Sequence, residues 1–204
     1  MKAIASLFFY LSFLLFVAAQ PQRSPMQVVQ EATDEVLVLV KDPKLSEEQR
    51  RTQVRTKIRS IIAERFDFRS MSQSVLATGW QKATAYERDR FVDFFTQNLV
   101  NTYFEIINSY TDEKIRYVKE KISGDRAVVD TLIATSKGEI PVSYKMKLGE
   151  DGWHTYDIAI EHSSLINNYR TLYSGIIKTE GIDGLLERLQ DKIELYKKNR
   201  AAAH

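Results

Sequence analysis

The sequence has no cysteine among its 204 residues, and only three histidines and four prolines. Without cysteine the chain can form no disulfide, no thiolate metal site and no lipid-modified cysteine after export. His154 and His162 flank one expected strand without the spacing of a metal site, and the third histidine is the final residue, His204. We therefore expect no metal site, no cofactor, and a fold held by its apolar core alone.

The eight glycines form none of the motifs that bind phosphate. Neither GxGxxG nor GxxxxGK occurs, and no GxSxG elbow presents an activated serine. The 29 basic and 27 acidic side chains leave a formal charge of +2, which is too small to attract nucleic acid. The sequence therefore favours neither nucleotide chemistry nor nucleic-acid binding.

A long apolar run occurs only at the N-terminus. Residues 1–19 carry a single charge, at Lys2, and are apolar almost without interruption from Leu7 onward. Val17-Ala18-Ala19 fits the small-residue cleavage site of a secretory signal peptide. The run is shorter than the ~20 residues of a spanning helix, so we expect a removed signal peptide, with an uncleaved membrane anchor as the alternative.

The mature chain is expected to be one exported domain over residues 20–200, acting as a monomer in the periplasm. Residues 201–204 resemble the remnant of an expression tag. No internal repeat and no low-complexity segment divides the rest.

Helices are predicted in the first half of the chain. Ser24 with Pro25 marks one helix start, and Ser46 and Thr84 begin two capping boxes that mark others. A short helical piece over residues 69–77 is expected to end at Thr78-Gly79. The last of these helices carries an apolar stripe formed by Phe91, Phe95, Leu99, Tyr103, Ile106 and Tyr110.

The second half changes to a period of two. Four strands are predicted at residues 115–122, 127–135, 140–148 and 153–161, joined by turns short enough only for antiparallel hairpins. A helical stripe follows from Leu165 to Ile177, and Gly181 separates it from a final helix. The expected fold is α+β, with N-terminal helices and two C-terminal helices packed on a four-stranded twisted antiparallel sheet.

Tyrosines recur on the faces that are expected to point inward, where a phenol normally needs a hydrogen-bond partner. Together with Met146 and many aliphatic residues, they give more inward apolar surface than this sheet and its helices need. That excess indicates an enclosed apolar cavity. The tyrosines are Tyr103, Tyr144, Tyr156, Tyr169 and Tyr173.

Asp157 is the carboxylate that most suggests chemistry, because it follows Tyr156 in an otherwise apolar strand. Beside a cavity it would serve as a general base, with Tyr156 or Tyr144 as the acid, in a small enzyme acting on an apolar substrate. Alternation instead predicts that Asp157 faces away from the core and pairs with a basic side chain such as Arg170. We favour that structural role and expect no catalytic residue.

Two segments resemble a known family. Residues 66–95, FDFRSMSQSVLATGWQKATAYERDRFVDFF, are similar to one signature of the MlaC family of periplasmic phospholipid-binding proteins, also called the toluene-tolerance family. Residues 153–170, WHTYDIAIEHSSLINNYR, are similar to a second, in which Trp, Tyr-Asp, Ser-Leu and Asn-Tyr-Arg recur at this spacing. The resemblance spans Pro25 to about Lys198. The sequence departs from the family pattern at His162-Ser163, where relatives commonly carry Gly-Val. Glycine permits backbone conformations that histidine disfavours, so the local turn can differ here.

The resemblance implies a carrier that is not an enzyme. Such a protein moves phospholipid between an outer-membrane lipoprotein complex and the substrate-binding subunits of an inner-membrane ABC transporter. Its acyl tails lie in a cavity between sheet and helices, and its headgroup lies near the mouth. A carrier is needed because ten exposed methylenes cost ~8 kcal/mol in water.

On that basis Arg116 and Arg170 are candidate headgroup contacts.

An alternative to the carrier is an interaction protein whose helical faces dock partners and whose interior is solid. Periodicity and the family's cavity together give the expected tail pocket, which consists of Phe95, Leu99, Tyr103, Val142, Tyr144, Met146, Tyr156, Ile158, Leu165, Ile166, Tyr169, Tyr173 and Ile176.

Overall fold

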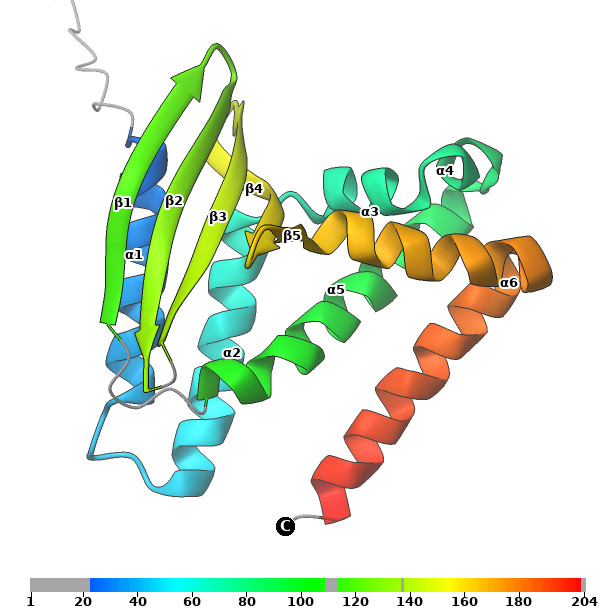
Figure 1. Cartoon of the computed structure of the whole chain (residues 1–204). Coiled ribbons are helices and arrows are strands. Elements are labelled where there is room, and N and C mark those ends of the chain that lie inside the picture. Colours follow the sequence, from blue (N-terminus) through cyan, green and yellow to red (C-terminus); the bar gives the residue numbers. More distant parts are fainter. Residues whose placement is uncertain (1–22, 109–113, 137, 203–204) are drawn as a thin grey trace, which may run out of the picture.

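The computed structural model describes residues 23–108, 114–136 and 138–202. The expected signal peptide, Tyr110 and His204 lie outside these residues. The α+β class and the order of helices and strands are as expected (Figure 1). The elements are α1 (Pro25–Val40), α2 (Glu47–Arg65), α3 (Phe68–Leu76), α4 (Thr78–Lys82), α5 (Ala85–Asn108), β1 (Lys114–Ser123), β2 (Arg126–Thr135), β3 (Gly138–Gly149), β4 (Gly152–Ile160), β5 (Ser163–Ser164) and α6 (Leu165–Ala202).

Local capping sets the starts of the long N-terminal helices, as the sequence predicts. The Ser46 hydroxyl accepts a hydrogen bond from the Gln49 backbone N–H, and the Gln49 side chain accepts one from the Ser46 N–H. Thr84 and Glu87 make the same reciprocal pair before α5. Ser24 caps α1. Among the described residues, no helix combines the length and the apolarity needed to cross a bilayer.

The expected short helix ends close to its predicted position, because α3 closes at Leu76 with Ala77 as its cap, but Thr78-Gly79 then belong to a further helix that the sequence did not predict. Ala77 interrupts the helical path with a φ of 48°, and Thr78 then begins the short helix α4. This second turn brings Trp80 into the core, where only 8% of its surface is exposed. Burying this large aromatic side chain stabilises the short helix that follows the break.

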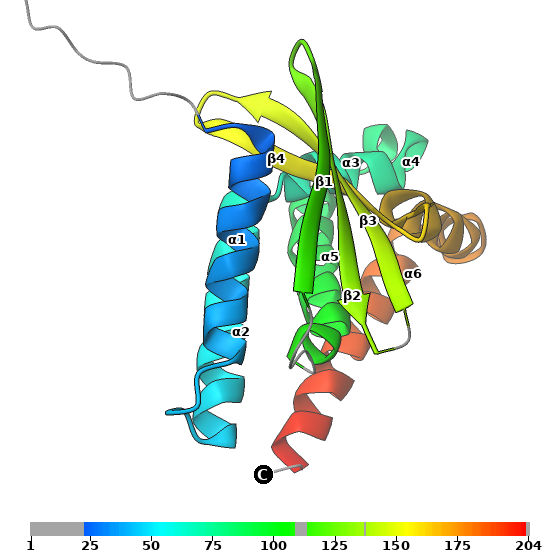
Figure 2. The ribbon, with the colours of Figure 1, turned by 60° about the vertical axis from the view of Figure 1, so that its left-hand side comes forward.

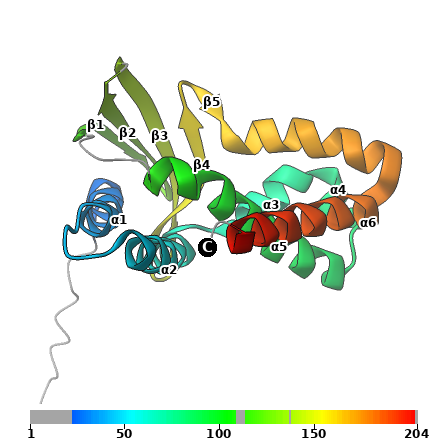
Figure 3. The same cartoon turned by 90° about the horizontal axis from the view of Figure 1, so that it is seen from below.

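The strands form one antiparallel sheet in the order β1-β2-β3-β4-β5. The four expected strands are present, and a fifth arises because Ser163–Ser164 pairs with the end of β4. α1 and α2 pack against each other (Figure 2) and lie on the same side of the sheet (Figure 3). The sheet therefore has an inner face, toward α1 and α2, and an outer face.

α6 consists of two helices, as expected, because Gly181 has a φ of 73° and a ψ of −174°. The first half leads away from β5, and the second half returns beside α5 (Figure 1). The stripe of α5 is less regular than expected. Ile106 was expected to be inward but is 49% exposed, because α5 also packs on α2 and buries Val100 and Phe104 instead.

A bulge changes which residues of β4 face inward. Lys145 lies opposite Asp157, but the next residue, Met146, lies opposite Thr155, so Tyr156 is an extra residue in β4. Directly opposed residues of an antiparallel pair share a face. The inner face therefore holds Trp153, Thr155, Ile158 and Ile160.

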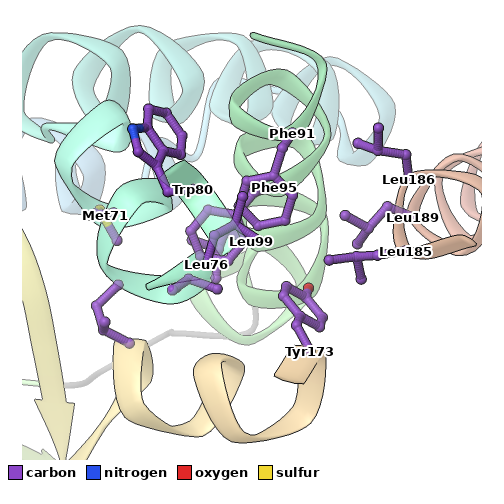
Figure 4. Close-up of a cluster of buried hydrophobic side chains, with 12 residues drawn as sticks. Met71, Leu76, Trp80, Phe91, Phe95, Leu99, Tyr173, Leu185, Leu186 and Leu189 are labelled. Carbon is purple, nitrogen blue, oxygen red and sulfur yellow. The ribbon is translucent and has the colours of Figure 1, made fainter. Parts of the chain in front are cut away.

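The apolar interior falls into three clusters that share no residue. A smaller α2 cluster joins Val40, Val54, Ile58 and Phe104. The sheet cluster packs Val28 and Val29 of α1 on Ala127, Val129, Met146 and Trp153. The helical cluster joins α3 to α6 through Met71, Val75, Leu76, Trp80, Phe91, Phe95, Leu99, Ile166, Tyr173, Leu185, Leu186 and Leu189 (Figure 4).

Candidate functional site

Seven of the expected pocket residues come together in or against the helical cluster. Phe95 and Leu99 of α5 are buried there, and Figure 4 shows Tyr173 reaching from the first half of α6 toward them. The Tyr169 ring meets Phe95 edge-on, with their centroids 5.3 Å apart. The four buried members are Phe95, Leu99, Ile166 and Tyr173, and the three half-buried ones are Tyr103, Tyr169 and Ile176.

Polar groups line the contact between α5 and α6. The Asn98 side-chain amide, which is 2% exposed, donates a hydrogen bond of 3.3 Å to the Tyr173 hydroxyl. One helical turn further along α5, Thr102 lies beside Tyr169. Burial raises the pKa of Tyr169, and the hydrogen bond with Thr102 lowers it by a smaller amount. Asn98 of α5 therefore faces Tyr173 of α6, and Thr102 of α5 faces Tyr169 of α6. The sequence analysis missed Asn98 and Thr102, although each directly precedes an expected pocket residue on α5.

Burial raises the pKa of all three tyrosines of this wall. It raises the pKa of Tyr103 to about 12, and the neighbouring Tyr169 adds to the rise. Burial also raises the pKa of Tyr169 and that of Tyr173. A phenol is already protonated near neutral pH, and the rise extends this to more alkaline pH, so all three can act as hydrogen-bond donors.

The expected pocket residues of the sheet lie apart from the helical cluster. Met146 is fully buried in the sheet cluster, and Tyr144 packs half-buried against it. Val142 is buried, whereas Ile158, opposite Tyr144 on the inner face, is only half-buried. Leu165, at the start of α6, is buried. The expected pocket residues are thus divided between the sheet and the helical cluster, and several of them keep part of their surface exposed.

The inward orientation expected for Tyr156 is wrong. Its ring lies under the Arg126 guanidinium, 4.9 Å from the ring centroid. Arg126 precedes Ala127, which belongs to the sheet cluster, so alternation places Arg126 on the outer face. The bulge at Tyr156 turns its side chain to the same outer face.

Asp157 occupies a structural position, but its environment differs from the expectation. It is buried, with 5% of its surface exposed, and pairs with Lys145 at 2.9 Å rather than with Arg170. It also accepts hydrogen bonds from the Ser164 hydroxyl and from the Ile166 backbone N–H. The carboxylate therefore holds the junction between β4 and α6.

The two candidate headgroup arginines are both engaged with other groups of the chain. Arg116 lies on β1 and donates to both carboxylate oxygens of Glu139, at 2.9 and 3.1 Å. Arg170 donates to the Ser74 carbonyl and to the Asn167 side chain, joining α6 to α3. The structure does not bring the two arginines together, so their headgroup role stays a prediction.

The turn between β4 and α6 places His162 in a backbone conformation that glycine adopts more readily than histidine. Glu161 and His162 have φ values of 48° and 67°, both in the left-handed region. They connect Ile160 to Ser163, which pair across the turn. A two-residue hairpin with positive φ at both central positions favours glycine or asparagine, so His162 occupies a strained position.

Two surface hollows, of about 550 and 660 Å³, lie along α1. Neither is lined by an expected pocket residue, so a continuous cavity between the sheet and α6 stays a prediction. Within the described ranges, no group of three or more histidine or carboxylate side chains is placed to hold a metal ion. The hollows are lined by Glu31, Asp34, Glu35, Leu37, Val38, Leu39, Lys41, Asp42, Pro43 and Lys57.

Comparisons with known proteins cover most of the chain. A family model described as "MlaC protein" matches residues 30–191. The intermembrane phospholipid transport system binding protein MlaC of Haemophilus influenzae is 22% identical over 185 residues, covering 88% of this chain and 86% of that protein. A solved phospholipid-binding protein from Ralstonia solanacearum, in complex with a phospholipid, aligns with a TM-score of 0.76 at 23% identity. The alignment covers 86% of this chain and 99% of that one, which shows a shared fold.

Proposed function

Because the matched family model spans most of the sequence, the chain belongs to the MlaC protein family, and we propose on that premise that it is a phospholipid-binding carrier. The acyl tails are buried between the inner face of the sheet and the wall formed by α5 and the first half of α6. The carrier works in the periplasm, after removal of the signal peptide. It exchanges lipid with an outer-membrane lipoprotein complex and with an inner-membrane ABC transporter.

The division of the apolar interior carries this proposal. A domain of this size usually has one contiguous core with minor satellites. Here the sheet cluster and the helical cluster are separate, and several side chains that pack against them or lie on the inner face of the sheet remain half-buried. Apolar surface of this kind is typical of a ligand site rather than of a solid interior. These half-buried residues are Tyr103, Tyr144, Ile158, Tyr169 and Ile176.

The proposed function requires no catalytic residue. The Asp157 carboxylate, considered as a general base, accepts from Lys145, Ser164 and Ile166 and is committed to the junction of β4 and α6. The name of the Haemophilus relative describes binding and transport. These observations support a binding protein, with the tail pocket formed by the expected residues other than Tyr156.

The decisive experiment measures lipid bound to the purified protein. Native mass spectrometry of protein isolated from the periplasm should show co-purified phospholipid, and delipidated protein should take up lipid from vesicles. Absence of both would contradict the proposal.

A pair of tryptophan variants locates the pocket. Ile158→Trp adds volume on the inner face, between the two walls, and should reduce bound lipid strongly while the protein remains folded. Val118→Trp makes the matched change on β1, where the side chain is 52% exposed, and should leave bound lipid unchanged. Equal lipid content in the two variants would place the tails elsewhere.

A further inference from the structure

The helical wall of the proposed pocket presents a continuous group of three tyrosines. The rings of Tyr169 and Tyr173 are 5.4 Å apart, and Tyr103 lies close enough to Tyr169 for the two to interact electrostatically. The Tyr173 hydroxyl accepts its hydrogen bond from Asn98, so its own proton remains available for donation. Within the described part of the chain, nothing hydrogen-bonds the Tyr103 hydroxyl. The wall therefore offers two unused O–H donors.

These donors are neutral, and this restricts what they can recognise. A phosphate is matched best by arginine or lysine, yet Arg116 and Arg170 are engaged with other groups of the chain. An ester carbonyl is a neutral acceptor that loses its water when a lipid enters a protein, and leaving it unpaired costs free energy. A diacyl phospholipid carries two such carbonyls, both at the boundary between its tails and its headgroup.

We propose that the Tyr103 and Tyr173 hydroxyls bind the ester carbonyls of the glycerol backbone of a diacyl phospholipid. Asn98 acts as a positioning residue, because its hydrogen bond holds the Tyr173 hydroxyl toward α5. The inference rests on the proposed function and deepens it. The protein then selects lipids by their ester linkage and discriminates only weakly between headgroups.

The linkage can be tested with two lipids that differ only in their carbonyls. Diacyl and dialkyl-ether phosphatidylcholine of equal chain length compete with a fluorescent phospholipid for the delipidated protein. The wild type should prefer the diacyl lipid by about threefold to tenfold, the size expected for one or two net hydrogen bonds. Tyr103→Phe and Tyr173→Phe keep the packed ring and remove only the hydroxyl, so each should reduce this preference, and the double variant should abolish it.

Tyr86→Phe is the matched control, since Tyr86 is 70% exposed on the same helix α5. It should retain the wild-type preference. If wild type binds both lipids equally, or if the phenylalanine variants keep the preference, the inference is overturned while the carrier function stands. If neither lipid displaces the probe and no lipid is taken up, the proposed function itself fails. Circular dichroism of each variant separates loss of contact from loss of fold.

Discussion

The Asp157 carboxylate accepts a hydrogen bond of 3.2 Å from the Ile166 backbone N–H, and so ties the end of β4 to the first turn of α6. Its other oxygen accepts from the Ser164 hydroxyl at 2.8 Å and from Lys145 at 2.9 Å. An acidic group at a helix N-terminus satisfies free backbone N–H groups and interacts favourably with the helix dipole. One buried carboxylate therefore helps to fix the start of α6 against β4.

Replacing Asp157 should destabilise the fold rather than abolish a reaction. Asp157→Asn keeps the volume but loses the charge that pairs with Lys145 and one acceptor oxygen. We expect the free energy of unfolding in urea to fall by about 1–3 kcal/mol. Asp89→Asn removes a carboxylate from an exposed ion pair with Arg69 and should change stability by less than about 0.5 kcal/mol. A stable Asp157→Asn protein that had lost a catalytic turnover would instead support an enzyme.

The Asp157 site also shows where prediction from sequence stops. Alternation correctly separates Asp157 from the inner face, but the partner Lys145 depends on strand register, which the sequence does not display. The bulge at Tyr156 has the same origin, since one inserted residue shifts the alternation on one side of the bulge relative to the other. Tyr156 was therefore assigned to the wrong face, whereas Ile158 was assigned correctly.

Features set by neighbouring residues were predicted well. The capping boxes at Ser46 and Thr84, the hairpin turns and the break at Gly181 all depend on contacts within a few residues. The division into three clusters depends on contacts between distant segments, such as α1 with β2, and no periodicity predicts it. For the same reason Asn98, whose partner is Tyr173, could not be recognised from α5 alone.

Two glycines of α6 should respond oppositely to the same substitution. A Cβ added at either Gly175 or Gly181 would meet no atom within 4 Å, so an alanine at either position would not clash with another part of the protein. Gly181 has a φ of 73° and a ψ of −174°, a region open almost only to glycine, so Gly181→Ala should lower stability by about 1–3 kcal/mol. Gly175 is helical, and Gly175→Ala should raise stability by about 0.5–1 kcal/mol. Urea denaturation measures both, and changes of the same sign would contradict the assignment of the break.

Glycine in place of His162 at the β4 turn should stabilise the protein. His162 has a φ of 67°, which costs an L-residue about 1–2 kcal/mol, partly offset by the greater freedom of glycine in the unfolded chain. We therefore expect His162→Gly to raise the free energy of unfolding by about 0.5–1 kcal/mol. His154→Gly, within β4, should lower it instead, because glycine weakens a strand interior. A loss of stability in His162→Gly would mean that this side chain makes a contact worth more than the strain.

The pH dependence of stability should reveal the burial of Tyr103. Its pKa is raised from 10.0 to about 12, because burial disfavours the phenolate. The unfolded chain releases this proton first, so the stabilising contribution is complete below pH 10 and is lost as the pH rises through about 12. Urea denaturation at about pH 9 and about pH 11 should show a smaller decline for Tyr103→Phe than for the wild type. Identical declines would mean that water reaches the Tyr103 hydroxyl freely in solution, and a hydroxyl in that state could not belong to the closed wall of a lipid pocket.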